Sequence, residues 1–415
     1  MAAVLGKGLK VSPEKITRGI QKLFRPSSGF LCQLYALMAT YQLIDTPHAF
    51  NAAMEVLRRQ PSIAFDLEFD SNYRRYGTTM CLIQITTAEG ENLIIDPLAG
   101  LDLTPLFAIF EDRNILKIMH SPGEDLRILH GLGCYPAPLW DNETTARILD
   151  YERTSLSALL EEKLGIVLSG AQQRSNWFTR PLSEAQLVYA AADAAHLHAL
   201  KAILDEEAEA KGLLPLVQSE QEALAQKRIE APDENVFLKP ADVRGLPPWD
   251  QHLLHALLAE RDAIARSRNK PAFQIADAAL LRKIVSDQDG GSPEREIYKS
   301  LQKPYNTPEY STRLLEAYAT ALREAEGQKM SKAKPRRERT GDYNQTDKDM
   351  LFAPVQEALA GKFGTYAARF LLSNGAVGDL LSHKKSLTTL GSVVRKEEIL
   401  AAAAKLGLDM SAYVG

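Results

Sequence analysis

The sequence is poor in cysteine and in long hydrophobic runs, and each shortage excludes a class of protein. Its three cysteines, Cys32, Cys81 and Cys134, lie far apart and form no Cys-x-x-Cys or Cys/His pairing. Neither a disulfide framework nor a zinc site is therefore indicated, and a reducing cytoplasm fits this composition best. No apolar run approaches the ~18 residues that a membrane-spanning helix needs. We expect a cytoplasmic protein without a membrane partner.

The sequence also lacks an excess of charge of either sign. It contains 49 basic and 53 acidic residues, which leaves a formal net charge of −4. A protein that coats nucleic acid through uniform positive charge is therefore excluded, and any site for a polyanion must be local. The content of 45% hydrophobic and 25% charged residues is ordinary for a globular protein. A chain of 415 residues can form two or three domains with cores of their own.

The first 37 residues lack the charged start, apolar block and small-residue cleavage site of a secretory signal. From Met38 the chain reads like the opening of a first strand and helix. We therefore expect residues 1–37 to be an N-terminal extension, and the sequence does not decide whether they belong to the native protein. A short amphipathic helix over residues 14–24 is the alternative.

Between about residues 41 and 211, apolar runs alternate with amphipathic segments, which is typical of a mixed α/β domain. We predict strands at 62–69, 80–87, 92–96, 115–119 and 138–141. The first three are separated only by turn-like stretches and should form an antiparallel meander. We predict helices at 123–132, 143–149 and 155–164, and one long helix from 183 to about 210. This order is expected of a ribonuclease-H-like core, a mixed sheet flanked by helices.

Past Gln226 the strand signals stop. Residues 227–245 carry prolines and a glycine among charges and are predicted to be a linker. Residues 246–326 are predicted to be helical because leucines recur at helical spacing. These leucines are Leu253, Leu254, Leu257 and Leu258. Residues 343–415 form a second predicted helical region. Its candidate core residues are Phe352, Val355, Leu359, Phe363, Phe370 and Leu371.

The two helical regions are joined by a predicted linker at 327–342 with a strong local charge. Six of the eleven residues at 329–339 are basic, and hardly any is apolar. We expect a flexible, exposed connector that adds salt-sensitive, sequence-independent affinity for nucleic acid. A merely solvated linker is the alternative.

Asp66 and Glu68 stand two residues apart in the apolar run at 61–70. Because side chains alternate along a strand, both carboxylates should project from one face. Two acids side by side in an apolar segment repel each other and resist desolvation. They therefore need a compensating cation, which we expect to be a divalent metal ion. An edge strand with two solvated acids is the alternative.

Two further acids lie downstream. Asp125 follows the predicted strand 115–119 at the start of a helix, where a carboxylate can also simply satisfy free helix amides. Asp193 stands among five alanines on a predicted helix, four residues after Tyr189, so the two share a helix face. Packing alone hardly explains an Asp in such a helix. The residues that could converge on one cleft are Asp66, Glu68, Asp125, Tyr189 and Asp193.

In their order along the chain, these motifs resemble the DEDD superfamily of 3′-5′ exonucleases in its tyrosine-bearing branch, and most closely the ribonuclease D family. The matches are Asp66-x-Glu68, the segment around Asp125, and Tyr189-x-x-x-Asp193. Further matches are Leu82-Ile-Gln84-Ile and Ser175-Asn176-Trp177-x-x-Arg180-Pro181-Leu182 ahead of Gln186. The family usually has Asp where this chain has Asn176, which weakens any role for that position but leaves the acidic set whole.

The resemblance implies an exonuclease domain over residues 38–226, followed by helical modules. Residues 246–326, with Arg261-Asp262 and Asn269-Lys-Pro271-Ala-Phe273, look like an HRDC domain, a helical nucleic-acid-binding module. Ribonucleases D carry two such modules, so residues 343–415 are expected to be the second, more divergent one. A helical dimerisation or packing element is the alternative for these regions.

The resemblance also implies a metal-dependent hydrolysis. Two Mg²⁺ or Mn²⁺ ions roughly 4 Å apart would bind the attacking water and the departing 3′-oxygen, and carboxylates suit such hard ions. We assign Asp66 to bridge both ions, Glu68 and Asp193 to complete one site, and Asp125 to reach the second, largely through water. Tyr189 would orient the attacking water, because a phenol is a poor base at neutral pH.

Three residues are candidates for holding the 3′ end of the substrate. Gln84 would hydrogen-bond to the terminal nucleotide, Trp177 would stack on it, and Arg180 would contact a phosphate. A core aromatic is the alternative for Trp177.

The expected activity is hydrolysis of RNA from its 3′ end to nucleoside 5′-monophosphates, with tRNA precursors or other structured RNAs as partners. A DNA exonuclease with the same metal chemistry is one alternative. A catalytically idle RNA-binding scaffold is another, although the complete acidic set argues against it. We expect a monomer, but the sequence fixes neither the oligomeric state, nor the physiological RNA, nor the choice between Mg²⁺ and Mn²⁺.

Overall fold

The computed structural model describes residues 40–168, 170–229, 238, 240–286, 292–334 and 345–415. The expected N-terminal extension, Cys32 and residues 335–339 of the basic connector lie outside these residues. Within the described ranges, no helix combines the length and the apolar character that crossing a membrane requires.

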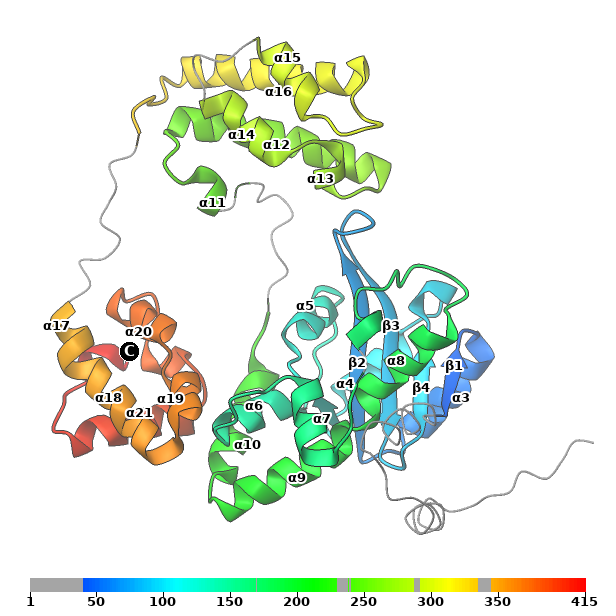
Figure 1. The fold of residues 1–415 in the computed structure, drawn as a ribbon, viewed down its shortest axis with the longest axis vertical. Helices are drawn as coiled ribbons and strands as arrows, with labels where there is room; N and C mark the ends of the chain where they lie inside the picture. The colour runs from blue at the N-terminus through cyan, green and yellow to red at the C-terminus, as the bar shows by residue number, and fades with distance from the viewer. Residues whose placement is uncertain (1–39, 169, 230–237, 239, 287–291, 335–344) are drawn as a thin grey trace, which may run out of the picture.

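A six-stranded mixed sheet in the order β1-β4-β3-β2-β5-β6 forms the centre of the first half of the chain (Figure 1). Its strands are β1 (Tyr41–Ile44), β2 (Ser62–Ser71), β3 (Thr78–Thr87), β4 (Asn92–Ile95), β5 (Leu116–Met119) and β6 (Leu139–Asp141). As predicted, β2, β3 and β4 form an antiparallel meander. The strands β1, β5 and β6 join it by parallel pairing.

Helices cover both faces of the sheet. One face packs on α3 (Pro47–Leu57), α4 (Thr104–Glu111) and α5 (Gly123–Gly131). The ring of Phe65 on β2 stacks on Phe110 of α4 with centroids 4.3 Å apart, which anchors this face. The other face is covered by α6 (Asn142–Ile148), α7 (Leu156–Leu164), α8 (Glu184–Ala195), α9 (Leu197–Ala210) and α10 (Leu214–Gln226). Two short 3₁₀ turns, η1 (Pro97–Ala99) and η2 (Gly170–Gln172), complete this part of the chain.

The prediction of one long helix from 183 to about 210 is wrong, because the chain breaks at His196 between α8 and α9. No proline or glycine marks the break in the sequence. The reason is tertiary: α8 packs its alanines on β3 and β4, whereas α9 packs Leu197 and Leu200 into a different part of the core. The buried side-chain amide of Asn142 donates to the carbonyl of Leu197, the first residue of α9, at 3.1 Å.

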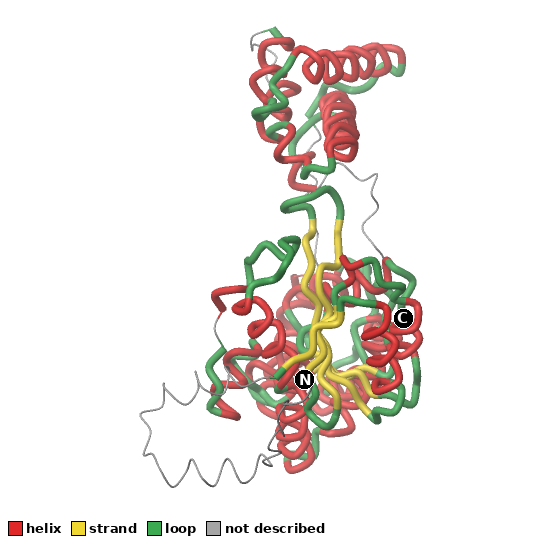
Figure 2. The backbone as a smooth tube through the Cα atoms, turned by 90° about the vertical axis from the view of Figure 1, so that its right-hand side faces the viewer, coloured by secondary structure: helices red, strands yellow, loops and turns green. Residues whose placement is uncertain are grey.

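The first helical region has a hydrophobic core of its own. It comprises α11 (Pro240–Val243), α12 (Pro248–Arg268), α13 (Ala272–Ile275), α14 (Ala278–Ser286), α15 (Pro293–Ser300) and α16 (Pro308–Gly327). The predicted core leucines of α12 are all buried in it. Tyr76, at the tip of the β2–β3 hairpin, also packs against this core. Figure 2 shows the two strands reaching from the sheet to this region.

The basic connector begins against this first helical region. Residues 329 and 331–334 are exposed, as predicted, but Met330 is partly buried and packs against the core of this region. The amide of Trp249 donates to the carbonyl of Ser331 at 3.1 Å, and the ammonium of Lys332 lies 3.9 Å from the Trp249 ring centroid. The described part of the connector is therefore anchored to the start of α12.

The second helical region shares one hydrophobic core with the sheet domain. It comprises α17 (Gln345–Asp347), the π-helical η3 (Lys348–Phe352), α18 (Ala353–Phe363), α19 (Thr365–Leu371), α20 (Asn374–Leu381), η4 (Leu387–Thr389), α21 (Val393–Lys405) and η5 (Ser411–Tyr413). Five of its six predicted core residues are buried, and Phe370 is partly buried. Arg395 of α21 forms a buried ion pair with Glu220 of α10 at 2.6 Å. Asp150, which follows α6, accepts hydrogen bonds from the first amides of α19, those of Tyr366 and Ala367.

Candidate active site

The strand β2 presents Asp66 and Glu68 on one face of the sheet. The intervening apolar side chains of Phe65 and Leu67 are buried in the core under the opposite face. This alternation fixes the direction of both carboxylates. After Glu68 the register with β3 shifts, so that Phe69 pairs with Met80. The shift leaves Cys81 as an extra residue on β3, and such bulges are common beside active sites because they re-aim side chains.

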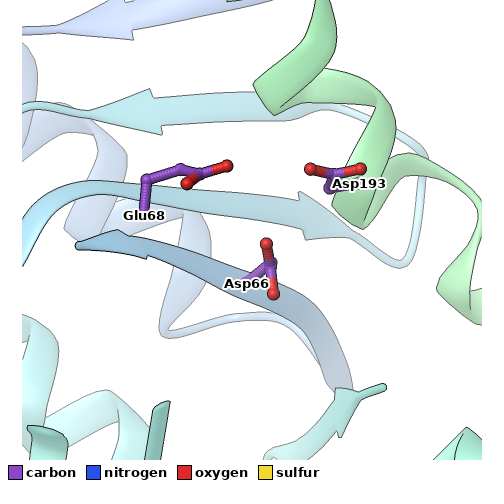
Figure 3. A group of neighbouring side chains, drawn as sticks. All are labelled: Asp66, Glu68 and Asp193. Atoms are coloured by element: carbon purple, nitrogen blue, oxygen red, sulfur yellow. The ribbon is translucent and has the colours of Figure 1, made fainter. Parts of the chain in front are cut away.

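Helix α8 brings a third carboxylate to this face. It begins with a capping box in which Ser183 and Gln186 satisfy each other's backbone amides. Ala190 and Ala191 are buried against the sheet, so the helix axis approaches it closely. Asp193 thereby faces Asp66 and Glu68, as Figure 3 shows, and one carboxylate oxygen from each of the three lies within 4.8 Å of the others.

Asp125 joins the same cluster from the start of α5. Its own amide and the amide of Leu67, which lies between the two acids of β2, are near enough to its carboxylate to lower its pKa against the effect of burial. The strand β5 pairs with β2 only as far as Ala64, which leaves the later part of β2 accessible to Asp125. Asp125 is therefore both a helix-start acid and a neighbour of Asp66.

The electrostatics of the cluster are those of uncompensated negative charge. Burial, and then the carboxylates of Asp66, Asp193 and Asp125, raise the pKa of Glu68 to about 10. Burial raises the pKa of Asp66 to about 6, although the nearby amide of Leu67 lowers this pKa. Burial and the charge of Asp66 raise the pKa values of Asp125 and Asp193 well above the ordinary range of an aspartate. In the described part of the chain, no Lys, Arg or His forms an ion pair with these acids.

This donor set fits divalent metal ions. Its oxygen atoms are hard ligands, they lie close enough to share an ion, and their mutual repulsion is relieved by a cation. Gln84 adds an unusual feature. It pairs with Asp66 across the strands, it is buried, and neither its amide oxygen nor its amide nitrogen has a hydrogen-bond partner within the described residues. Its polar group is thus buried without a protein partner on the face that carries the acids.

Tyr189 stands one helical turn before Asp193, and its hydroxyl is near enough to that carboxylate to lower its pKa. Burial and the negative charges of Asp193 and Glu68 raise the pKa of the Tyr189 hydroxyl far above its ordinary value. The hydroxyl therefore keeps its proton at neutral pH and acts as a hydrogen-bond donor. The ring of Trp177 lies behind that of Tyr189, with centroids 6.1 Å apart and planes inclined by 34°.

The structure does not support the predicted stacking of a nucleotide on Trp177. Its side chain is only 4% exposed and packs with Leu82, Leu187 and Tyr189, so Trp177 is a core aromatic that backs the tyrosine. The sequence left this alternative open because an aromatic beside a polar loop is compatible with either role.

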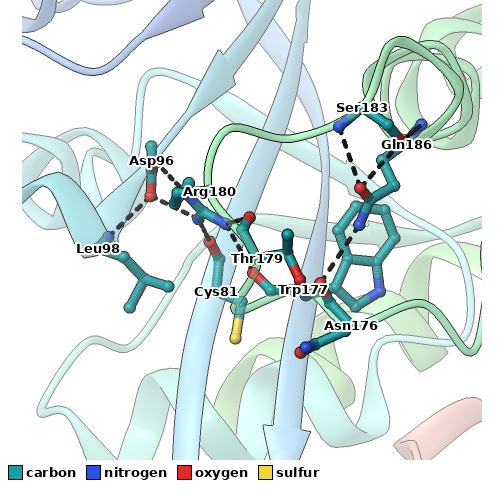
Figure 4. Close-up of polar contacts among 9 residues, drawn as sticks. All are labelled: Cys81, Asp96, Leu98, Asn176, Trp177, Thr179, Arg180, Ser183 and Gln186. Carbon is teal, nitrogen blue, oxygen red and sulfur yellow. Dashed lines mark hydrogen bonds and ion pairs between the residues drawn. The ribbon is translucent and has the colours of Figure 1, made fainter.

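The predicted phosphate contact of Arg180 is not supported either (Figure 4). Its guanidinium forms a bidentate ion pair with Asp96, with distances of 2.5 and 2.7 Å. It also donates to the carbonyl of Cys81, the bulged residue of β3, and to that of Trp177. All of these partners are protein groups, so Arg180 fastens the Trp177 loop to the sheet. Asp96 lies 84 positions away in the sequence, which is why the sequence pattern gave no hint of this pairing.

Sequence reasoning also missed Asp70, the last acid of the run that contains Asp66 and Glu68. Its buried carboxylate accepts hydrogen bonds from the amides of Tyr73, Arg74 and Arg75 at the hairpin tip. An Asp followed by Ser and Asn is a turn signal that could have found this role.

The comparisons with known proteins agree with this geometry. A family model described as a 3′-5′ exonuclease matches residues 41–209, which include all four acids. Ribonuclease D of Zymomonas mobilis is 33% identical over 302 residues, covering 70% of this chain and 75% of that protein. Ribonuclease D of Gluconacetobacter diazotrophicus is 29% identical over 282 residues, covering 67% of this chain and 71% of that protein.

The solved structure of Escherichia coli RNase D, described as an exoribonuclease involved in structured RNA processing, is similar to this one over both halves of the chain. The TM-score is 0.67 at 26% sequence identity, and the match covers 88% of this chain and 98% of that chain.

Proposed function

Since this chain belongs to the ribonuclease D family and is a 3′-5′ exoribonuclease, we propose that it shortens tRNA precursors or other structured RNAs that carry a 3′ tail. The products are nucleoside 5′-monophosphates. The observation that carries the proposal is the meeting of Asp66, Glu68 and Asp193 from β2 and α8, with ligand oxygens within 4.8 Å of one another.

Asp66 is central to the proposed site because it lies between the other acids. Glu68 and Asp193 would complete one ion site with it, and Asp125 would reach a second, largely through water. When bound, two divalent cations, Mg²⁺ or Mn²⁺, would lower the pKa of a water molecule and neutralise the departing 3′-oxygen. The raised pKa values of the acids mean that protons leave these carboxylates when a cation is bound.

Tyr189 would orient the attacking water by donating a hydrogen bond. Its elevated pKa excludes it as a general base near neutral pH. Trp177 and Arg180 would act indirectly. Trp177 packs behind the ring of Tyr189, and Arg180 holds the loop that contains Trp177. Gln84, with its unpartnered buried amide, remains the candidate for a direct hydrogen bond to the terminal nucleotide.

The proposed domains are an exonuclease domain at 38–226, a linker at 227–245, an HRDC domain at 246–326, a basic linker at 327–342 and a divergent HRDC-like domain at 343–415. The separate core of the first helical region supports its being a module of its own. The core that the second region shares with α6, α9 and α10 supports a packing role for that region. We expect the protein to act as a monomer.

The test is degradation of a 5′-labelled single-stranded RNA with a free 3′ end, beside the same RNA with a blocked 3′ end and a DNA of the same sequence. Each is incubated with Mg²⁺, with Mn²⁺ or with EDTA. Stepwise shortening of the free RNA only in the presence of metal supports the proposal. Equal attack on the blocked RNA would overturn it, and preferential attack on the DNA would favour a DNA exonuclease.

A further inference from the structure

A groove lies where the tip of the β2–β3 hairpin meets the first helical region. It is lined by the tip, by the loop that precedes α8, and by the segment from the end of α12 to α13, with a volume of about 550 Å³. The lining residues are Tyr73, Arg74, Arg75, Asn176, Phe178, Lys270, Phe273 and Gln274. None of the proposed metal ligands belongs to it.

The groove carries a local positive charge in a protein whose net charge is −4. Arg74, Arg75 and Lys270 line it, and the lining contains no Asp or Glu as far as the described residues define it. None of the three cations forms an ion pair with a carboxylate within those residues. The guanidinium of Arg74 donates to the carbonyl of Arg174, at 3.3 Å. The cations therefore remain available for a polyanion.

Aromatic rings are interleaved with these cations. The side chains of Tyr73 and Phe273 are 65% and 54% exposed, which is unusual for large rings without a ligand. The guanidinium of Arg75 lies 4.0 Å from the ring centroid of Phe178. Cations that track a backbone beside exposed rings on which bases stack are the chemistry that recognises single-stranded nucleic acid.

The groove is built rather than accidental. On one side, the buried carboxylate of Asp70 holds the amides of Tyr73, Arg74 and Arg75, which fixes the tip. On the other side, the tip is bound to α12. The hydroxyl of Tyr76 donates to Asp262 at 2.6 Å. The amide of Tyr76 donates to the side chain of Asn269, the residue before Lys270, at 3.3 Å.

Two chain segments link the groove to the acidic cluster. Glu68 and the end of β2 at Ser71 are three residues apart on the same strand, which spans about 10 Å. Phe178 of the groove follows Trp177, whose ring backs Tyr189. The groove and the acidic cluster are therefore held by the same strand and the same loop.

We propose that this groove binds the single-stranded RNA just upstream of the 3′ end and delivers that end to the acids. The proposal rests on the proposed function and adds to it a location and a chemistry for the substrate tail. The phosphates lie against Arg74, Arg75 and Lys270, and bases stack on Tyr73 and Phe273.

The experiment measures equilibrium binding separately from hydrolysis. Binding of a fluorescent 12-nucleotide single-stranded RNA to the full chain is followed by anisotropy in EDTA, where no cleavage occurs. The variants are Lys270→Ala and Phe273→Ala. Their matched controls are Lys299→Ala and Tyr298→Ala, which remove an exposed lysine and an exposed aromatic ring from α15, outside the groove. Hydrolysis of the same RNA by the wild-type chain with Mg²⁺ or Mn²⁺ is measured in parallel.

We expect each groove variant to weaken binding by about fivefold to tenfold, and each control to stay within about twofold of the wild type. The slope of log Kd against log salt concentration should become shallower by about 0.7 for Lys270→Ala and should not change for Phe273→Ala. If the groove variants bind RNA as tightly as their controls do, the proposed RNA-binding role of the groove is overturned, whereas the proposed exonuclease activity is not. Wild-type protein that binds through the groove but does not hydrolyse RNA would instead overturn the proposed function.

Discussion

The two ends of the β2–β3 hairpin have opposite chemistry. At the base, Asp66 and Glu68 are largely enclosed, lie beside other carboxylates, and have raised pKa values. At the tip, Arg74 and Arg75 stand in a solvent-exposed groove beside aromatic rings. One pair of ten-residue strands thus carries a partly buried anionic site and an exposed cationic one. This difference fits the proposed division between metal-assisted hydrolysis at the acids and RNA binding at the groove.

The two ends also differ in how they are stabilised. The base contains mutually repelling groups that no protein cation neutralises in the described residues, so its residues oppose folding until a cation is bound. The tip has its amides satisfied by Asp70 and its tyrosine bound to α12. Mutations at the base should therefore affect turnover and leave or improve stability, whereas mutations at the tip should reduce stability and RNA affinity together.

The largest effect should come from neutralising an acid at the base. We expect Asp66→Asn or Asp193→Asn to lower kcat by at least ~1,000-fold, because several kcal/mol of stabilisation by metal is lost. The same variants should melt at a higher temperature than the wild type in EDTA, because repulsion is relieved. The control is Glu55→Gln on the exposed face of α3, which should keep the kcat and the melting temperature of the wild type. If either variant turned over RNA at nearly the wild-type rate, the assignment of that acid as a metal ligand would be wrong.

A smaller loss of turnover should follow removal of the Tyr189 hydroxyl. We expect Tyr189→Phe to lower kcat by about 10- to 100-fold, since one hydrogen bond in a charged site is lost while the ligands stay. KM for RNA should change little, because the groove is untouched. Tyr41→Phe is a matched control, since Tyr41 donates to Glu184 at 2.8 Å at the other end of α8. Equal effects of the two variants would argue against a role for Tyr189 in the reaction.

At the tip, Asp70→Ala should reduce the free energy of unfolding by about 1–3 kcal/mol, because three backbone amides of the tip lose their buried acceptor. Affinity for the 12-nucleotide RNA should fall several-fold in the same variant, as the tip residues lose their fixed positions. Asp102→Ala removes an exposed aspartate that accepts from a single backbone amide, that of Thr104, and serves as the control. If Asp70→Ala had the stability and the RNA affinity of the wild type, the distinction between the two ends of the hairpin would be wrong.

The smallest effect concerns pH in the metal-free protein. The pKa of Glu68 is raised from an ordinary 4.5 to about 10 in the folded state. The folded chain thus binds more protons than the unfolded chain between these values, so stability should fall as pH rises through this window. In EDTA, the melting temperature should decrease from pH 6 to pH 9 in the wild type and less so in Glu68→Gln. If the melting temperature of the wild type rose with pH, or changed with pH as much as that of Glu68→Gln, Glu68 would not be held protonated.

The sequence predicted the parts of the site that depend on local periodicity. The period of two in the run 61–70 placed Asp66 and Glu68 on one face, and the period of the helix placed Tyr189 and Asp193 on another. The antiparallel meander followed from short turns between apolar runs. These inferences succeed because the residues concerned are neighbours within one element.

The contacts that the sequence did not reveal depend on partners far away in the sequence. Arg180 and Trp177 were assigned to substrate, yet Arg180 pairs with Asp96 and Trp177 packs behind Tyr189. The break at His196 has no local signal, because two separate parts of the core determine it. The groove joins a hairpin tip to a helix almost 200 positions later, as the bond from Tyr76 to Asn269 shows.

By itself, the sequence determined that Asp66 shares a strand face with Glu68 and that Tyr189 shares a helix face with Asp193, because strand and helix periods orient residues within an element. Only the tertiary structure decided which of them meet. The packing of α8 against the sheet brings Asp193 near Asp66 and Tyr189 onto the ring of Trp177. The packing of α5 brings Asp125 to the amide of Leu67. Packing is a property of the whole core, and its long-range contacts leave no mark in any short stretch of residues.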